Sequence, residues 1–431
     1  MWEHGRDRRG EAAVIAVPPL ARERELGPAF DLLAAFDPAD GFLFERQGLG
    51  VASTGEAVRI VATPGERQIA RAAGEVAEAF GRILRERDAV VPLAVGAFPF
   101  EATGVAVLVV PARAVVRREE RLTREIVVGE ADSSSSTDER IVGRAEPFAP
   151  FGRMQLREEP GADSYATAVR AAVAMINAGA MRKVVLARTL EVDAGRELDP
   201  RQLLHRLRAV DPQAYTFAVA AGAEAGDGLL VGASPELLVS RHGREVRANP
   251  LAGSAPRAGD SDEDRANADQ LTADAKNLRE HAIVVDAVAA ALDPLCDELT
   301  WGHEPVLLPT ANVWHLSTQF RGVLRKPAPS ALDLAAVLHP TPAVGGDPAQ
   351  VAGRAIRELE PFERGLYAGP VGWVDANGDG EWAIAIRCAR LHADRATLFA
   401  GAGIVSGSDP ASEVDETDRK FRAFLDSLRW G

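Results

Sequence analysis

The stretch Gly401-Ala402-Gly403-Ile404-Val405, which Ser408-Asp409-Pro410 separates from Glu413, Glu416 and Lys420, carries the clearest structural signal of the chain. The apolar run predicts a strand, and the residues after the proline predict a helix. Positions i, i+3 and i+7 place the two carboxylates and the ammonium on one face of that helix. An adjacent apolar stripe would dock the helix on the core, and it consists of Phe421, Phe424, Leu425 and Leu428.

Two carboxylates one helical turn apart beside a glycine-lined strand suit a hard divalent cation, which takes oxygen ligands and keeps some of its waters. The same residues are also typical of a solvated helix face with an i,i+4 pair between Glu416 and Lys420. Taken alone, the helix favours the solvated face, and the rest of the sequence changes that balance.

Length and composition indicate an ordinary globular protein of 431 residues, with 46% hydrophobic and 26% charged residues. The net charge of −14 disfavours binding to nucleic acid and to anionic membranes, so local Arg and Lys side chains would have to bind an anionic substrate. The only cysteines are Cys296 and Cys388, which excludes a disulfide framework and a cysteine-based zinc site. Because Met1–Gly10 is polar and no run of about twenty apolar residues occurs, we expect a cytoplasmic, soluble protein.

The order of helical and strand patterns favours the α+β class, because hairpins lie beside long helices without regular βαβ spacing. Helices are expected at Glu66–Glu86, Ser164–Ala178, Asp262–Leu292 and the C-terminal segment. Strands are expected at Leu93–Phe98, Gly104–Val110, Lys183–Val192 and Trp382–Ala389, in a hairpin of Gly228–Ser240 with Glu245–Leu251, and around turns at Asp375–Gly380 and His392–Arg395. Ser133–Ser136 indicates a loop near the boundary between a variable N-terminal part, 1–150, and a second part, 151–431, within one compact domain.

Three local patterns imitate known motifs but lack a defining residue. The glycines of Gly401-Ala402-Gly403 are followed by Ser406 where a dinucleotide-binding loop needs a third glycine. Asp375–Gly380 begins like a calcium-binding EF-hand loop, but Ile386 stands in place of the glutamate at its twelfth position. Gly232–Glu236 resembles the nucleophile turn of a hydrolase with Glu in place of its second glycine, so a serine hydrolase is disfavoured.

Four charged residues stand among apolar ones. Lys183 opens an apolar strand, although a lysine at that place is more often a solvated edge residue. Glu236 has apolar neighbours that would raise the pKa of its carboxyl group, and closing a bulge is an equally good interpretation. Glu280 faces away from one apolar stripe of its helix, but the apolar residues just beyond it place it at the edge of a core. Arg387 lies in an apolar strand, and a buried arginine needs an anion from the protein or from a ligand.

These residues belong to a series of segments that resembles the chorismate-utilising enzymes, a family that includes anthranilate synthase component I. The match covers roughly residues 160 to 430, in the family's order, while the first 150 residues match only loosely. Its remaining segments are Pro250-Leu251-Ala252-Gly253-Ser254, Trp314-His315-Leu316, Leu338–Gly346, Glu358–Phe362 and Tyr367–Trp373. The resemblance implies the α+β fold of anthranilate synthase component I, with two large, mostly antiparallel sheets packed together and flanked by helices.

The resemblance also implies roles for individual residues. Family members add a nucleophile at C2 of chorismate and expel the C4 hydroxyl group, with Mg²⁺ on the substrate carboxylate. By position, Lys183 is then the base that deprotonates water, which requires a lowered pKa, and Glu236 is the general acid. The magnesium ligands are Glu280 and Glu416, with Glu413 acting through water. The residues that contact substrate are Arg387 and Tyr367 at a carboxylate, together with Gly253, Ser254, Ala343, Val344, Gly401, Ala402 and Lys420 around it.

The nucleophile distinguishes the branches of the family. Ammonia-using anthranilate synthases carry a non-basic residue where this chain has Lys183, and aminodeoxychorismate synthases carry a lysine where it has Ala252. The remaining branches are isochorismate synthases, of the siderophore or the menaquinone pathway, and salicylate synthases, which go on to eliminate pyruvate. The residues of these motifs look most like those of the isochorismate synthases of the siderophore branch. We therefore expect a monomeric, chorismate-converting isomerase without a glutamine amidotransferase subunit, and a degenerate binding homologue is the non-enzymatic alternative.

Overall fold

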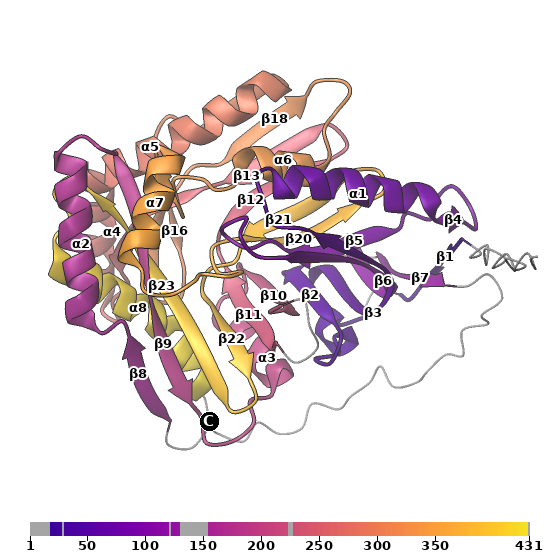
Figure 1. Cartoon of the computed structure of the whole chain (residues 1–431), viewed down its shortest axis with the longest axis horizontal. Coiled ribbons are helices and arrows are strands. Elements are labelled where there is room, and N and C mark those ends of the chain that lie inside the picture. The colour runs from indigo at the N-terminus through magenta and orange to yellow at the C-terminus, as the bar shows by residue number, and fades with distance from the viewer. Residues whose placement is uncertain (1–17, 28–29, 120–121, 130–153, 223–226, 430–431) are drawn as a thin grey trace, which may run out of the picture.

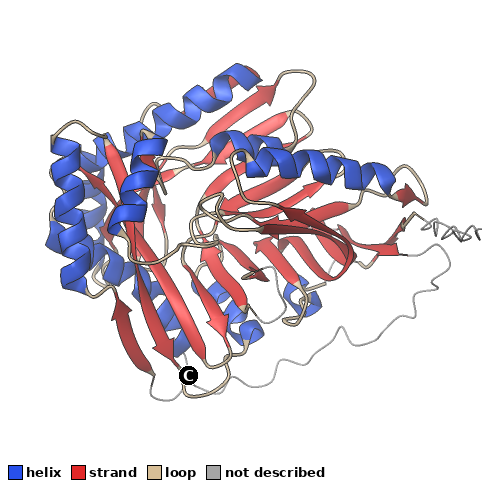
Figure 2. Ribbon diagram, viewed as in Figure 1, coloured by secondary structure: helices blue, strands red, loops and turns tan. Residues whose placement is uncertain are grey.

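The computed structural model describes residues 18–27, 30–119, 122–129, 154–222 and 227–429 (Figure 1). The serine-rich segment 133–136 and the polar start of the chain lie outside the described residues. Helices lie around a large body of strands, as the blue and red ribbons of Figure 2 show. None of the helices in the described ranges is both long and apolar enough to cross a membrane.

The helices in the described part of the chain flank the strands. They are α1 (Gln68–Arg82), α2 (Ala162–Asn177), α3 (Pro200–Val210), α4 (Ser261–Ala273), α5 (Ala275–Leu292), α6 (Ala331–Leu338), α7 (Ala349–Leu359) and α8 (Pro410–Arg429), with short 3-10 turns η1 (Leu32–Ala35) and η3 (Asp293–Leu295). Helices α2 and α8 pack on each other and on β9 and β23, whereas α1 and α6 pack together along the upper side of the molecule in Figure 1.

Twenty of the described strands form one hydrogen-bonded network that divides at β6 (Ala106–Glu119) into two arms. The first arm runs β8 (Gln155–Glu159), β9 (Lys183–Asp193), β23 (Arg395–Val405), β22 (Cys388–His392), β11 (Leu229–Ser234), β10 (Tyr215–Ala220), β2 (Phe42–Arg46), β3 (Leu49–Ala62), β6, β7 (Leu122–Gly129), β1 (Leu20–Glu25) and β4 (Leu84–Arg85), with β19 (Gly346–Asp347) beside β9. The second arm leaves β6 through β5 (Leu93–Ala97), β20 (Pro370–Asp375), β21 (Gly380–Ile384), β12 (Leu237–His242), β13 (Glu245–Asn249), β18 (Phe320–Leu324) and β15 (Cys296–Trp301).

A separate three-stranded sheet contains β14 (Leu251–Pro256), β17 (Val313–Ser317) and β16 (Val306–Pro309). Among the described strands, only the pair β1–β4 is parallel, so the expected α+β class with mostly antiparallel pairing is confirmed. The two expected sheets are the two arms, which share β6 and are therefore continuous. Strands from the first 129 residues pair with later ones in both arms, β2 with β10 and β5 with β20.

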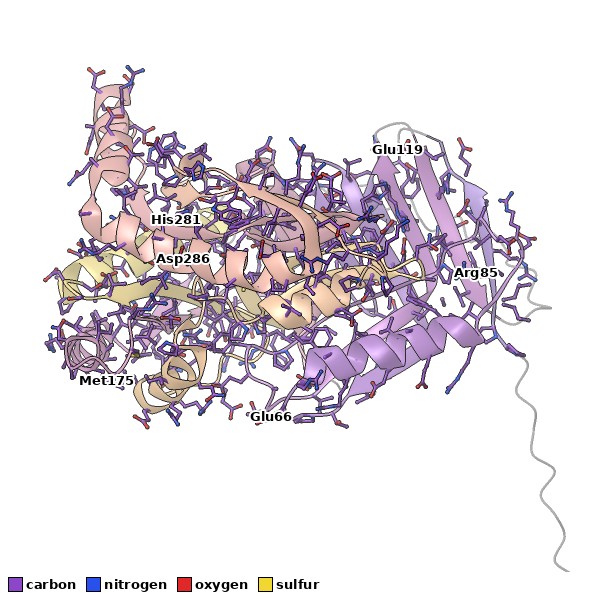
Figure 3. The ribbon with its side chains drawn as sticks, turned by 90° about the horizontal axis from the view of Figure 1, so that it is seen from above. Glu66, Arg85, Glu119, Met175, His281 and Asp286 are labelled. Atoms are coloured by element: carbon purple, nitrogen blue, oxygen red, sulfur yellow. The ribbon has the colours of Figure 1, made fainter. Side chains whose placement is uncertain are left out.

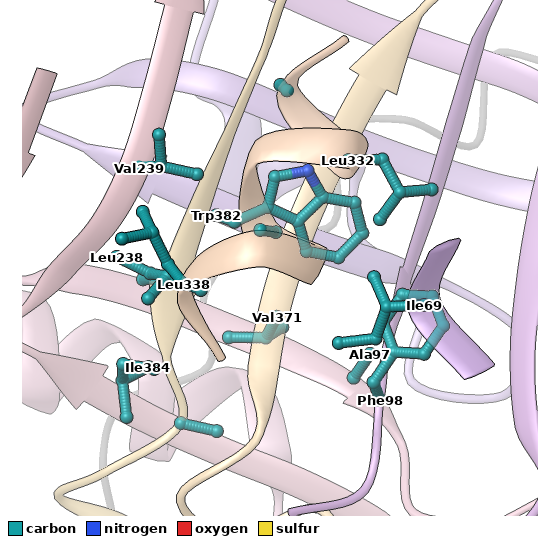
Figure 4. Packing of buried hydrophobic residues seen from close by; sticks show 14 of the residues in the cluster. Ile69, Ala97, Phe98, Leu238, Val239, Leu332, Leu338, Val371, Trp382 and Ile384 are labelled. Carbon is teal, nitrogen blue, oxygen red and sulfur yellow. The ribbon is translucent and has the colours of Figure 1, made fainter. Parts of the chain in front are cut away.

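The core beneath α6 shows how the second arm is stabilised. Trp382 on β21 is fully buried, and its ring lies 5.8 Å from that of Phe98. Figure 4 shows Leu332 and Leu338 of α6 and Val371 of β20 around the same indole. An aromatic side chain buries a large apolar area, so this contact fixes α6 on the sheet.

Three expected elements are broken in the structure. Segment 228–240 forms two strands, because Pro235 has no backbone N–H for the ladder and the N–H of Glu236 donates to the Ser234 hydroxyl group at 3.2 Å. The predicted helix 262–292 is two helices, since the side chain of Asp274 accepts the N–H of Asn277 and starts α5. Arg387 lies between β21 and β22 with φ of 51°, not inside a strand as predicted.

Both strand breaks occur where the chain passes from one arm to the other. The segments β11–β12 and β21–β22 cross side by side, and two backbone hydrogen bonds join the crossings. Ile384 donates to the Glu236 carbonyl at 3.1 Å, and Ala233 donates to the Arg387 carbonyl at 3.1 Å. Glu236 and Arg387 therefore lie side by side where the chain crosses between the two arms.

Candidate active site

One cavity of about 70 Å³ lies beside the two strand crossings, and most of the predicted site residues line it. Strands β14 and β23, helices α5 and α8 and the two strand crossings all contribute to its wall. Figure 3 shows α5, marked by His281 and Asp286, lying across the molecule while α4 points away from it. The predicted residues that line the cavity are Glu236, Gly253, Ser254, Glu280, Ala343, Val344, Tyr367, Arg387, Gly401, Glu416 and Lys420.

Lys183 is fully buried at the start of β9 and forms an ion pair with a residue of the cavity wall. Its Nζ atom lies 3.0 Å from Oε1 of Glu280, which is itself buried on α5. Gly403 on the neighbouring strand makes this contact possible, because a Cβ atom there would overlap the Glu280 carboxylate. A buried ion pair of this kind is sensitive to loss of either partner, since the remaining charge would be uncompensated.

The carboxyl group of Glu236 is suited to donate a proton at neutral pH. Its side chain is 3% exposed, and burial raises its pKa to about 8 against the lowering effect of Lys183. This agrees with the raised pKa expected from its apolar neighbours. The strand break at Pro235 turns Glu236 into the cavity wall.

Glu416 and Lys420 form the i,i+4 pair expected on α8, but they do so inside the cavity wall. The Lys420 ammonium donates to Oε1 of Glu416 at 2.6 Å and to the carbonyl of Gly401 at 2.8 Å. Burial alone would raise the pKa of Glu416, but the ammonium outweighs it and the pKa is lowered. Glu416 is therefore a carboxylate at neutral pH.

Glu413 does not line the cavity, in contrast to the other two proposed metal ligands. It is 1% exposed and accepts a hydrogen bond from Nζ of Lys276 on α5 at 2.7 Å. Burial, with the nearby Glu416 charge, raises its pKa to about 7. Lys276 was not predicted as a site residue, although its i,i+4 spacing to Glu280 places both side chains on one face of α5.

The donor chemistry of the cavity fits a hard divalent cation. In the described ranges no group of three or more His, Cys, Asp or Glu side chains is arranged to hold a metal ion. Glu280 and Glu416 nevertheless offer carboxylate oxygens to one cavity, and Mg²⁺ typically uses one or two protein carboxylates with water and substrate oxygens. These two residues are therefore able to hold the ion, with the substrate completing its coordination.

Arg387 is directed by a neutral histidine. Its Nη2 atom lies 2.9 Å from Nε2 of His315 on β17, and burial lowers the pKa of His315 well below its usual value. The uncharged ring accepts one N–H and leaves the guanidinium charge available for a ligand carboxylate. His315 belongs to the Trp314-His315-Leu316 motif of the family resemblance, but its sequence context predicted no role in the site.

The remaining predicted residues form the cavity walls, with one exception. Tyr367 is stacked on Phe399 with ring centroids 4.9 Å apart, and Gly253 has a φ of 80° that favours glycine. Ala402 does not line the cavity, because alternation along β23 turns Gly401 and Gly403 toward it and Ala402 away. The expected contact was with the backbone at Gly401 and Ala402, and for Ala402 it stays a prediction.

The model of the family described as "Chorismate binding enzyme" matches residues 32–429. The chain belongs to that family. This chorismate-binding enzyme is 40% identical over 367 residues to isochorismate synthase DhbC of Bacillus subtilis (strain 168), with 84% of this chain and 87% of the relative covered.

Solved structures agree with the fold of this family member. The crystal structure of DhbC from Bacillus anthracis superposes with a TM-score of 0.79 at 35% identity and covers 92% of this chain and 98% of that one. Anthranilate synthase component I from Streptococcus pneumoniae TIGR4 superposes with a TM-score of 0.66 at 21% identity, covering 97% and 95% of the two chains, and shows the fold alone. The expected fold family is confirmed.

Proposed function

We propose that this chorismate-binding enzyme is an isochorismate synthase that uses Mg²⁺ and water. The observation that carries the proposal is the pairing of two functional groups around one cavity. Lys183, a nitrogen base, lies behind its wall, and Glu236, a carboxyl group protonated at neutral pH, lies in that wall. The similarity to isochorismate synthase DhbC over most of both chains supports the same reaction.

Acid and base act on opposite ends of one displacement. Lys183 takes a proton from water as the oxygen adds at C2 of chorismate, both ring double bonds shift by one position, and Glu236 gives its proton to the C4 hydroxyl group, which leaves as water. The product is an isomer of the substrate, so no oxidant or second substrate is needed. The base role requires Lys183 to give up its own proton and separate from Glu280 before the reaction, because an ammonium cannot accept a proton.

Other residues hold the substrate in place. Arg387, oriented by His315, can bind a planar carboxylate through two N–H groups. Glu280 and Glu416 would hold Mg²⁺, which would supply positive charge to a substrate carboxylate. Glu413 would act on the ion through water, and Tyr367, Ala343 and Val344 shape the apolar part of the cavity.

We propose that the enzyme supplies a siderophore pathway, with the menaquinone pathway as the alternative. We further propose that it acts as a monomer in the cytoplasm. Water needs no ammonia channel, so no glutamine amidotransferase subunit is required.

Product analysis tests this function. Purified enzyme with chorismate and Mg²⁺ should form isochorismate, and enzyme given isochorismate should return chorismate. Salicylate with an equal amount of pyruvate, formed as fast as the isomerisation, would instead identify a salicylate synthase. Absence of any product would favour a binding protein without activity.

A further inference from the structure

The edge of β9 next to the cavity lacks a strand partner over a short stretch. On that side β19 pairs with residues 183–184 and β8 pairs with residues 189–193. Of the described strands, none pairs with residues 185–188 on that side. Val185 and Ala187 are buried there, so their backbone polar groups need other partners.

A buried ion pair fills this gap. Nη2 of Arg364 donates to the Val185 carbonyl at 2.7 Å, and Oε1 of Glu360 accepts the N–H of Ala187 at 2.8 Å. The two side chains bind each other, with Nε of Arg364 2.9 Å from Oε2 of Glu360. Glu360 is 7% exposed and Arg364 is 5% exposed. The pair therefore takes the place of a strand beside β9.

The same arginine also reaches a loop of the cavity. Its Nη1 atom donates to the Val344 carbonyl at 2.8 Å, and its own carbonyl accepts the N–H of Tyr367 at 3.0 Å. Phe100 covers the guanidinium, with the ring centroid 4.3 Å from Cζ. One side chain thus connects the strand that begins with Lys183, the loop of Ala343 and Val344, and the turn before Tyr367.

We propose that Arg364, held by Glu360, is a positioning residue for the reaction. It sets the distance between Lys183 on β9 and the loop of Ala343 and Val344. It does so without touching the substrate, since neither Arg364 nor Glu360 lines the cavity. Lysine cannot replace it, because one ammonium cannot bind Glu360, Val185 and Val344 in the fixed directions of a guanidinium. This inference rests on the proposed isochorismate synthase reaction.

The test compares Arg364→Lys and Glu360→Gln with wild-type enzyme. Glutamine at position 360 keeps an oxygen that accepts the N–H of Ala187, but it loses the negative charge that binds the Arg364 guanidinium. Because Arg387 and the carboxylates of α5 and α8 make no contact with the pair, kcat should fall about 10- to 100-fold in Arg364→Lys while KM changes less than about threefold. Glu360→Gln should lie between that variant and wild type.

Arg206→Lys is the matched control. Arg206 is also buried and donates to backbone carbonyls, those of Ser427 and Leu428, but neither it nor these residues line the cavity. It should lower the thermal unfolding midpoint without changing kcat more than about threefold. The proposal is overturned if folded Arg364→Lys and Glu360→Gln keep wild-type kcat, or if Arg206→Lys loses kcat equally. Lack of turnover by the wild-type enzyme would instead contradict the proposed function.

Discussion

The Nζ atom of Lys183 lies 3.0 Å from Oε1 of Glu280, so the proposed base and a proposed metal ligand form one buried ion pair. Each group needs the other in the folded chain, because either charge alone would be costly to bury. During turnover, however, Lys183 is proposed to take a proton from water, whereas Glu280 is proposed to bind Mg²⁺. The pair thus links folding stability to catalysis at one position.

Lys183→Ala should abolish hydration of chorismate, because general-base assistance contributes roughly 10²–10⁴ in rate. The variant should also be less stable, since Glu280 is left uncompensated. The double variant Lys183→Ala with Glu280→Ala should recover stability but not activity, as measured by thermal unfolding and product formation. Retention of more than about a tenth of wild-type turnover in the single variant means that Lys183 is not the base.

Glu280→Ala and Glu416→Ala should each remove magnesium-dependent activity, because an ion held by so few carboxylates cannot lose one without a large loss of affinity. Glu413→Ala should have a milder effect, since Glu413 lies behind the cavity wall and is bound by Lys276. Calorimetric titration of Mg²⁺ into each variant in the presence of chorismate measures the affinity for Mg²⁺ and therefore tests this order. Undiminished binding in Glu280→Ala or Glu416→Ala contradicts the ligand assignment.

The forward rate should fall as pH rises through about 8, where Glu236 loses the proton that it must donate. Burial raises this pKa from 4.5, so the folded state holds the proton more tightly than the unfolded state. The folding stability that this tighter proton binding contributes is fully present below about pH 4.5. It is lost as the pH rises through about 8. Glu236→Gln should lose activity and remove this alkaline dependence from thermal unfolding. A pH profile of kcat unchanged between 7 and about 9 is incompatible with this acid.

Gly403→Ala should inactivate the enzyme, because its Cβ atom would displace Glu280 from Lys183. Gly353→Ala is a suitable control. Gly353 lies in α7 with only Arg357 near its Cβ position, at 3.9 Å, so alanine there should stabilise by about 0.5–1 kcal/mol. Kinetics and thermal unfolding of both variants would separate a specific clash from a general effect of adding a methyl group. Wild-type kcat in Gly403→Ala would show that the contact is dispensable.

Periodic segments were predictable from the sequence, and long-range pairing was not. The helix of Glu416 and Lys420 and the strand of Lys183 lie where their patterns placed them. The break at Pro235 was missed, because residues 228–240 read as one apolar run; the proline signals a break, and the two halves pair with strands of different arms.

Site residues were found where a charge interrupts an apolar run or matches a family motif. Lys276, Glu360 and Arg364 act through contacts with distant segments, which local patterns do not reveal. The family resemblance included the segment of Glu360 but carried no role for it. Glu280 is buried beside Val284 and Val288, as the apolar residues beyond it indicated. The buried face of α5 is nevertheless not the stripe expected from helical periodicity, because tertiary packing sets the orientation of the helix.

The origin of the new hydroxyl oxygen tests the central claim most directly. Enzyme, chorismate and Mg²⁺ are mixed in ¹⁸O-labelled water for a single turnover, and the isochorismate is analysed by mass spectrometry and by the position of the label. Addition of water at C2 with loss of the C4 hydroxyl group predicts one labelled oxygen at C2 and none elsewhere. Unlabelled isochorismate would mean that the hydroxyl group migrates within the substrate, and it would contradict the assignment of Lys183 as the base that activates water.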